Sequence, residues 1–175
     1  MYLNKVNLFL VISICLIFFF LTYNDVKSQE PKIISGIAKV VDGDTIKIGK
    51  NKIRLLGIDA PEKKQQCQKP WLSIFFLTFN KDYKCGEIST NKLKIKINNK
   101  LVMCKSNNKD RYNRFIAECF KDKININKWM ISNGYAVAYR KYSKKFISQE
   151  NLAKKEKLGI WVGTFEMPWE WRKKN

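Results

Sequence analysis

Four of the fifteen carboxylates in this chain lie within one short stretch, although the chain as a whole carries a formal net charge of +19. They are Asp42, Asp44, Asp59 and Glu62. A basic chain that gathers acids in one place is expected to hold a cation there. The sequence contains no histidine, which excludes Ser-His-Asp and Cys-His nucleophiles and histidine-ligated metal sites. Oxygen ligands alone favour a hard cation, calcium or magnesium.

Two arginines stand where they could complete this acidic cluster. Arg54 precedes Asp59 on the same predicted strand, and Arg114 begins a strand after a polar loop. A guanidinium binds a phosphate through two hydrogen bonds and stays charged. The alternative for each arginine is a surface ion pair. Hydrolysis of a phosphodiester, an anion that resists anionic attack, needs a Lewis acid, an activated water and cationic clamps, and this set of residues could supply them.

Three strands in a meander are predicted to position these groups. Residues 38–49 read AKVVDGDTIKIG, in which Asp-Gly between alternating apolar residues indicates a hairpin. The next run, KIRLLGIDAPE, ends at Pro61, which cannot lie inside a central strand. Asp44 then starts the second strand, and Asp59 and Glu62 follow the third. Neighbouring antiparallel strands can bring these ends together.

The remaining elements are predicted less uniformly. The apolar residues 71–80 either pack over the core as an inserted hairpin or expose a membrane or partner surface. Residues 87–98 fit a strand or a helix. Strands are expected at 101–104 and 115–120, and helices at 125–133 and 146–158. The tryptophan-rich tail from residue 159 is predicted to wrap on the core.

The N-terminal 28 residues resemble an export signal. A lysine precedes an apolar run from Leu8 to Leu21, and Val26 and Ser28 fit a cleavage pattern. The alternative is an uncleaved anchor in the inner membrane, formed by residues 6–22. A single domain, 29–175, with an insertion at about 67–85, is expected to follow, exported to the periplasm or outside the cell, and to act as a monomer.

Cysteine usage agrees with export. Removing residues 1–28 leaves Cys67, Cys85, Cys104 and Cys119. An even number in an exported chain favours disulfides, and of the three possible connectivities we favour Cys67–Cys85 and Cys104–Cys119, the second across a hairpin. Buried free thiols are the alternative, and zinc is disfavoured because no two cysteines have ligand spacing.

The basic excess is almost all lysine, 29 against five arginines. A solvated surface accounts for part of it. A charge of +19 at this size also predicts attraction to nucleic acid or anionic membrane, with strong salt dependence.

The motifs VDGDT, RLLGIDAPE, DRYNR and AKKEKLGIW, in this order, resemble the staphylococcal nuclease (thermonuclease) family over residues 33–162. The resemblance implies an α+β, mainly β fold: a five-stranded OB-type β-barrel with about three helices. It also implies a calcium-dependent endonuclease that cleaves DNA or RNA and leaves 3′-phosphates.

The resemblance also implies residue roles. Asp44, Asp59 and the Ala60 carbonyl would bind calcium, with Asp42 behind them. Glu62 would activate water, and Arg54 and Arg114 would clamp the phosphate. Nucleotide contacts would come from Arg111, Tyr112 and Tyr139.

Two positions depart from the family pattern. Ala60 replaces a threonine and keeps only its carbonyl, and Asn113 replaces a glycine, which could shift Arg114. The main alternative function is a non-catalytic OB-fold that binds nucleic acid through lysines and stacking aromatics.

Overall fold

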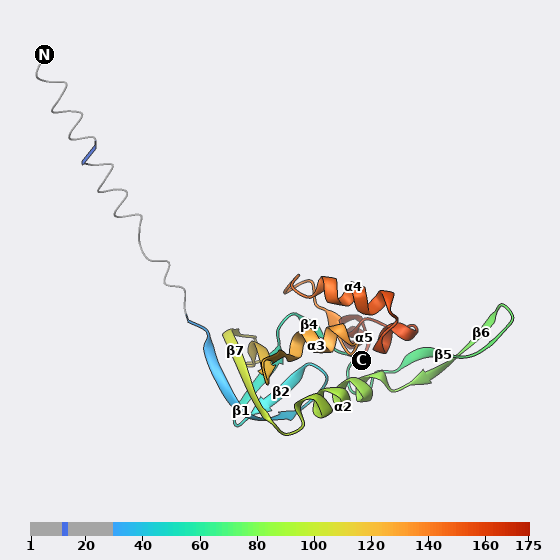
Figure 1. The fold of residues 1–175 in the computed structure, drawn as a ribbon, viewed down its shortest axis with the longest axis horizontal. Helices are drawn as coiled ribbons and strands as arrows, with labels where there is room; N and C mark the ends of the chain where they lie inside the picture. The colour runs from blue at the N-terminus through green and yellow to red at the C-terminus, as the bar shows by residue number, and fades with distance from the viewer. Residues whose placement is uncertain (1–11, 14–29) are drawn as a thin grey trace, which may run out of the picture. The chain divides into compact units, whose positions relative to one another are not determined.

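The computed structural model describes residues 12, 13 and 30–175, so the signal or anchor predicted for residues 1–28 lies outside the described residues, those two positions excepted. Residues 31–175 form one unit, shown in Figure 1. Within the described ranges, no helix is long and apolar enough to cross a bilayer.

Five strands close into a barrel. They are β1 (Lys32–Val40), β2 (Thr45–Ile48), β3 (Asn51–Leu55), β7 (Leu101–Lys109) and β8 (Phe115–Lys121). The sheet order is β3-β2-β1-β7-β8, and a parallel pairing between β3 and β8 closes the ring. A short strand, β9 (Ile124–Asn125), pairs antiparallel with the end of β8 and is not part of the ring. The predicted OB-type α+β fold is therefore confirmed.

The predicted meander is present, with one difference. Ala38 lies opposite Ile48 and Val40 opposite Ile46, as expected for a turn at residues 42 and 43. The third run, however, is not one strand. It breaks after β3 at Gly57, whose φ of 75° is in the left-handed region. It resumes as the separate strand β4 (Ile58–Asp59), which pairs with β10 (Val137–Ala138).

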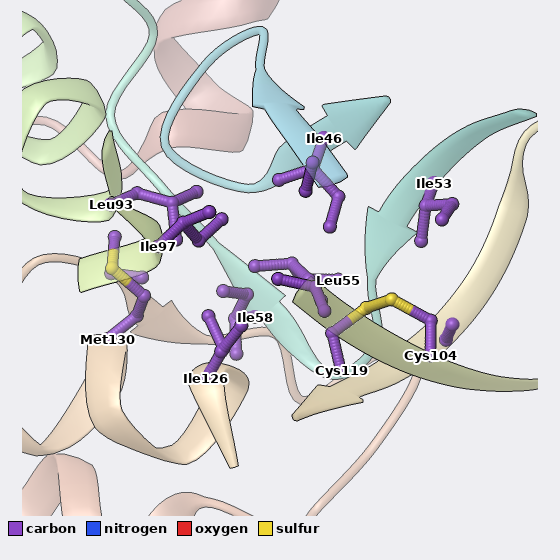
Figure 2. Packing of buried hydrophobic residues seen from close by; sticks show 14 of the residues in the cluster. Ile46, Ile53, Leu55, Ile58, Leu93, Ile97, Cys104, Cys119, Ile126 and Met130 are labelled. Atoms are coloured by element: carbon purple, nitrogen blue, oxygen red, sulfur yellow. A yellow bond between two sulfur atoms is a disulfide. The ribbon is translucent and has the colours of Figure 1, made fainter. Parts of the chain in front are cut away.

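Two helices pack against the barrel and complete its core. The first, α2 (Cys85–Ile97), buries Leu93 and Ile97 one turn apart and leaves Ile95 70% exposed, which settles the ambiguous 87–98 segment as a helix. The second, α3 (Ile126–Ser132), starts at Asn125, whose side chain accepts a hydrogen bond from the Lys128 N–H. Figure 2 shows the resulting cluster of isoleucine, leucine and methionine side chains, with the Cys104–Cys119 disulfide at one side of it.

The C-terminal part is more helical than predicted. Helix α4 (Ile147–Lys155) agrees with the expectation, and a 3-10 turn, η1 (Gly159–Val162), follows it. The tail was expected only to wrap on the core, yet it forms helix α5 (Pro168–Lys174), with proline in its first turn, where the absent N–H has no intrahelical partner to lose.

The cysteine predictions are confirmed in the structure: Cys67 is bonded to Cys85, and Cys104 to Cys119. Cys104 and Cys119 lie directly opposite each other on β7 and β8. The insertion is a hairpin of β5 (Cys67–Ile74) and β6 (Leu77–Tyr83). Its apolar residues do not pack over the barrel, contrary to the first expectation, since residues 71–80 are all exposed.

Candidate active site

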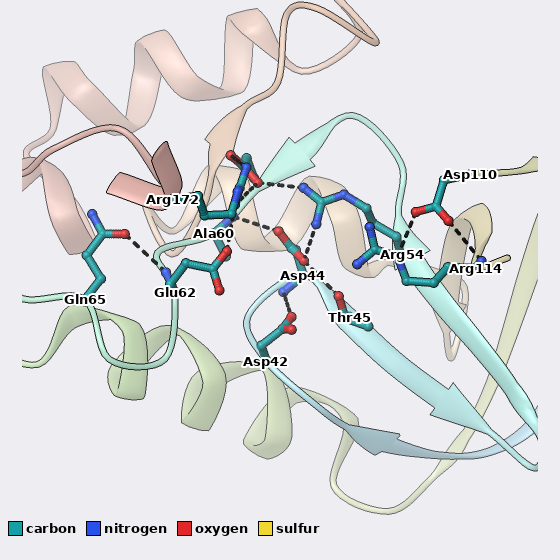
Figure 3. Close-up of polar contacts among 11 residues, drawn as sticks. Asp42, Asp44, Thr45, Arg54, Ala60, Glu62, Gln65, Asp110, Arg114 and Arg172 are labelled. Carbon is teal, nitrogen blue, oxygen red and sulfur yellow. Dashed lines mark hydrogen bonds and ion pairs between the residues drawn. The ribbon is translucent and has the colours of Figure 1, made fainter. Parts of the chain in front are cut away.

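Arg54 joins two of the predicted carboxylates. Its guanidinium donates to Asp44 Oδ1 at 2.8 Å and to Asp59 Oδ1 at 2.6 Å, as Figure 3 shows. Asp44 and Asp59 are nearly or fully buried. Buried carboxylates require a partner, and the forked guanidinium provides one for both. Arg54 therefore brings together carboxylates that are fifteen positions apart in the sequence.

The local fold explains this meeting. Pairing of β2 with β3 sets Thr45 opposite Arg54, so Asp44 lies beside the arginine at the start of β2. The break at Gly57 turns the chain back into β4, where Asp59 pairs with Val137. The strand break that the sequence prediction missed is thus the feature that turns Asp59 toward Arg54.

Asp44 also reaches the next predicted ligand. Its Oδ2 accepts a hydrogen bond from the Ala60 N–H at 3.1 Å, and its Oδ1 accepts one from the Thr45 hydroxyl at 3.0 Å. Asp42 lies behind it and accepts from the Asp44 N–H at 3.1 Å. Burial, and then the negative charge of Asp44, raise the pKa of Asp42 to about 6. The four predicted metal-site residues are therefore neighbours.

The pKa of Asp59 is subject to opposing effects. Burial raises its pKa to about 6, against hydrogen bonds from Arg172, and the Asp44 charge acts in the same direction as burial. The charged form of such a buried carboxylate, next to a second carboxylate, is stabilised by a nearby positive charge. Such a charge is already present in the structure, from an unexpected residue.

Arg172 of helix α5 is that residue, and sequence reasoning missed it. Its guanidinium donates to Asp59 Oδ1 and Oδ2 at 3.1 and 2.8 Å. It also donates to Glu62 Oε1 at 2.7 Å. The side chain of Arg172 is 33% exposed and that of Glu62 32%. No motif pointed to Arg172, because it lies 110 residues from Glu62 in a tail without clear periodicity.

The same helix covers a predicted nucleotide contact. Trp169 stacks on Tyr139, with ring centroids 5.5 Å apart and planes inclined by 5°. Tyr142 meets Tyr139 edge to face at 4.8 Å. Helix α5 therefore contacts the predicted site at two places, through Arg172 and through Trp169.

Hydrogen bonding and close packing of its backbone fix the position of Glu62. Its N–H donates to the Gln65 side chain, whose amide donates in turn to the Glu166 carbonyl at 2.6 Å. Gly86 packs against the Glu62 carbonyl so closely that a Cβ there would lie 1.7 Å from the oxygen. Gln65 is fully buried. The carboxylate thus projects from a rigid backbone.

Arg114 lies at the same end of the barrel but is paired elsewhere. Parallel pairing sets Arg54 opposite Ile116, so Arg114 precedes that partner by two residues. Its Nε donates to Asp110 Oδ2 at 2.7 Å. Although burial opposes the change, hydrogen bonds from the Arg114 N–H and guanidinium lower the pKa of Asp110. Figure 3 shows Arg114 beside Arg54, turned toward Asp110.

The loop before Arg114 explains its orientation. Asn113 has a φ of 60°, so asparagine takes the left-handed conformation that the family's glycine would supply. Tyr112 is 68% exposed. The guanidinium carbons of Arg111 and Arg114 lie 5.4 and 5.3 Å from its ring centroid. Arg111 and Tyr112 are therefore near Arg114 on the surface, whereas Tyr139 lies under α5.

The donor set is compatible with a hard cation. Asp44, Asp59 and the Ala60 carbonyl offer only oxygen, which suits calcium. In residues 12–13 and 30–175, no three acidic or cysteine side chains are gathered so as to hold a metal ion. Arg54 and Arg172 instead neutralise the carboxylates, which shows that this position accommodates positive charge.

Fold and cluster together define an OB-type barrel protein with paired carboxylates and guanidiniums at one end of the barrel. Comparison with known families makes this class specific. Residues 52–163 match the family described as Staphylococcal nuclease homologue, and the chain belongs to that family.

The relatives that the chain resembles include proteins named as endonucleases. The chain is 34% identical to "Succinoglycan biosynthesis protein ExoI" of Rhizobium meliloti over 79% of its own length and 69% of the relative's. It is 32% identical to an "Uncharacterized endonuclease" of Escherichia coli O157:H7, covering 78% and 82% of the two chains. It is 29% identical to "Endonuclease YncB" of Bacillus subtilis, covering 77% and 64%.

Proposed function

We propose that this chain is a calcium-dependent nuclease that hydrolyses phosphodiester bonds of DNA or RNA and leaves 3′-phosphates. The observation that carries the proposal is Arg54 bound between Asp44 and Asp59 in a chain of the staphylococcal nuclease homologue family. Two relatives named as endonucleases support the nuclease activity.

The roles follow from the chemistry that the bond requires. Glu62 would accept a proton from the attacking water, for which its partly exposed carboxylate is suited. Arg54 and Arg114 would bind the phosphate oxygens and stabilise the charge that develops on them. Calcium, held by Asp44, Asp59 and the Ala60 carbonyl, would supply Lewis acidity when bound. Asp42 would orient the Asp44 backbone behind these ligands.

The nucleotide around the reacting phosphate would be bound by the exposed loop. Among the described residues, Arg114 binds Asp110 through its Nε. The terminal nitrogens of the same guanidinium would therefore be left to bind a phosphate. Arg111 and Tyr112 are exposed beside it. Tyr139 would contact a base only after Trp169 moves off its ring. Helix α5 would therefore have to shift for the complete site to form.

Export is part of the proposal. Two disulfides in one small domain are typical of oxidising compartments such as the periplasm or the extracellular space. A signal peptide cleaved near Ser28 would deliver a monomeric enzyme there, and an uncleaved segment 6–22 would instead retain the enzyme at the inner membrane.

A nuclease assay with matched variants tests the activity. The full chain is incubated with single-stranded DNA or RNA, with calcium or with a chelator. We expect cleavage only with calcium, and a loss of about a hundredfold or more in Glu62→Gln. Glu87→Gln is the control, because the one ion pair of Glu87 within residues 30–175 is an exposed one with Lys84, at the start of α2. Full activity in chelator would contradict the proposed site.

One observation favours a second candidate, a non-catalytic nucleic-acid-binding OB-fold. Arg172 already neutralises Asp59 and Glu62, so these carboxylates have a positive partner without a metal ion. Such a protein would bind DNA in a gel-shift assay yet cleave nothing, with calcium or without it, and an Arg172→Gln variant would remain inactive. Cleavage by the wild type or by the Arg172→Gln variant would exclude this candidate.

A further inference from the structure

The β5–β6 hairpin extends away from the barrel, as Figure 1 shows. Its base is firmly attached. The Cys67–Cys85 disulfide ties β5 to the start of α2, and Gln68 exchanges two backbone hydrogen bonds with Thr164, at 2.8 and 3.0 Å. A projecting hairpin fixed in this way presents its outer half at a defined position rather than as a loose loop.

The outer half of the hairpin is amphipathic. Cross-strand pairs put Leu72 opposite Phe79 and Ile74 opposite Leu77, and alternation sets these four side chains on one face. They are between 42% and 55% exposed. The opposite face carries the pair Ser73 and Thr78, whose hydroxyls lie 3.3 Å apart. One face is therefore apolar and the other is polar.

The tip is the most exposed apolar part. Phe75 is 100% exposed and Phe76 92%. Phe75 has a φ of 50°, a left-handed conformation that bulky residues adopt only at a cost. Trp71, 64% exposed, lies at the bulge between Pro70 and Leu72. Large apolar side chains that remain in water on a fixed element indicate a binding surface.

Two lysines lie at the root of the apolar face. Lys69 is directly opposite Lys81, on the same face as Leu77 and Phe79. Like charges directly across a strand pair are destabilising. An anionic group between them would relieve this repulsion. The face thus carries apolar side chains toward its tip and positive charge at its root.

We propose that this hairpin docks on an anionic lipid bilayer, with its apolar face and phenylalanine tip in the headgroup and acyl boundary and with Lys69 and Lys81 on the lipid phosphates. Amphipathic helices bind membranes with their apolar face buried to a depth of about 5–10 Å, and the apolar face of this hairpin would be buried in the same way. Shallow docking leaves the strand edges among headgroups and water, where their backbone groups can be satisfied. Trp71 lies between Lys69 and Leu72 in the chain, and tryptophan is enriched at the interface between lipid and water.

Charge distinguishes this occupant from the other two that the surface could take. A second copy of the chain would bring another net charge of +19 toward the same face, which opposes self-association. A nucleic acid would be attracted by the charge and could stack bases on Phe75, Phe76 and Trp71. It would leave the aliphatic side chains of Leu72, Ile74 and Leu77 without an apolar partner. An anionic bilayer satisfies both the charge and the aliphatic surface.

Vesicle binding tests the proposal in the full chain, independently of any nuclease activity. Vesicles of phosphatidylcholine, with or without phosphatidylglycerol, are sedimented with the protein. We expect the Phe75→Ser/Phe76→Ser double variant to lose about tenfold or more in binding to anionic vesicles, because two exposed aromatic side chains no longer enter the lipid. Lys69→Gln/Lys81→Gln should reduce the preference for phosphatidylglycerol. Ile95→Ser, which removes an exposed apolar side chain from α2, is the control and should bind as the wild type does.

A second measurement separates the hairpin from any lipid binding by the N-terminal segment. Lipids brominated on the acyl chain quench nearby tryptophan, and we expect quenching in the wild type that largely disappears in Trp71→Phe. Three outcomes would overturn the proposal: equal vesicle binding by all variants, equal quenching in Trp71→Phe, or serine variants that change only self-association in sedimentation or only DNA affinity. Unchanged disulfides and unfolding temperature establish that the variants are folded.

Discussion

Replacing Arg172 by glutamine should expose what this residue does in the acidic cluster. The change removes three hydrogen bonds, two to Asp59 and one to Glu62. Truncating one member of a buried ion pair costs about 3–5 kcal/mol, whereas an exposed pair contributes about 0–1 kcal/mol. Arg172 is 33% exposed and Asp59 retains Arg54, so the structure predicts an intermediate value. We expect the metal-free variant to lose about 1–3 kcal/mol of unfolding free energy.

Calcium should offset part of this loss. In the wild type a cation near Asp59 must displace the Arg172 guanidinium, and in the variant it need not. We therefore expect Arg172→Gln to bind calcium about tenfold more tightly, which corresponds to roughly 1.4 kcal/mol. Ligand linkage then stabilises the variant more than the wild type as calcium is added.

Urea unfolding and calorimetric calcium titration measure both quantities. Lys173→Gln is the matched control, since in the part of the chain that the structure describes Lys173 pairs with Glu170 alone, one turn earlier on the same helix. Its stability and calcium affinity should match the wild type. If Arg172→Gln loses the same stability with calcium as with chelator, and its calcium affinity is unchanged or weaker, Arg172 is a structural residue that does not compete with the cation.

Three further outcomes are expected. Arg114→Lys keeps the charge but loses the fork, so the cleavage rate should fall about a hundredfold with little change in substrate affinity; a near-normal rate would remove Arg114 from the site. Asp44→Asn should weaken calcium dependence and activity together while circular dichroism shows a retained fold, because Arg54 keeps Asp59 as its partner; intact calcium dependence would argue against Asp44 as a ligand. DNA affinity should fall more than roughly tenfold between 50 and 200 mM salt, as counterion release requires, and a flat response would exclude a polyanionic substrate.

The barrel and most of the site were predictable because they depend on local signals. An Asp-Gly turn between alternating apolar residues fixed the β1–β2 register, and with it the place of Asp44. Helix α3 followed from Ile126, Trp129 and Met130 on one helical face and from Gly134 after the last turn. The disulfide across β7 and β8 followed from the predicted hairpin. In each case, the residues that decide the structure are close together in the sequence.

What the sequence did not predict depends on contacts between distant segments. The third strand breaks at Gly57 because β4 pairs with β10, which is nearly eighty residues away in the chain. Arg172 reaches Asp59 and Glu62 from a tail that has no amphipathic period. No local propensity encodes these pairings.

Closure of the barrel by β3 and β8 has a consequence for how the protein folds. The meander β1–β2–β3 and the hairpin β7–β8 join neighbouring segments, but the β1–β7 and β3–β8 pairings both join strands separated by the insertion and α2. Closing such long loops costs chain entropy, so these two pairings are expected late in folding. Arg54 lies on β3 and Arg114 directly precedes β8, so the two arginines of the candidate site come together only when these strands pair. The proposed nuclease would therefore have no assembled site until the barrel closes.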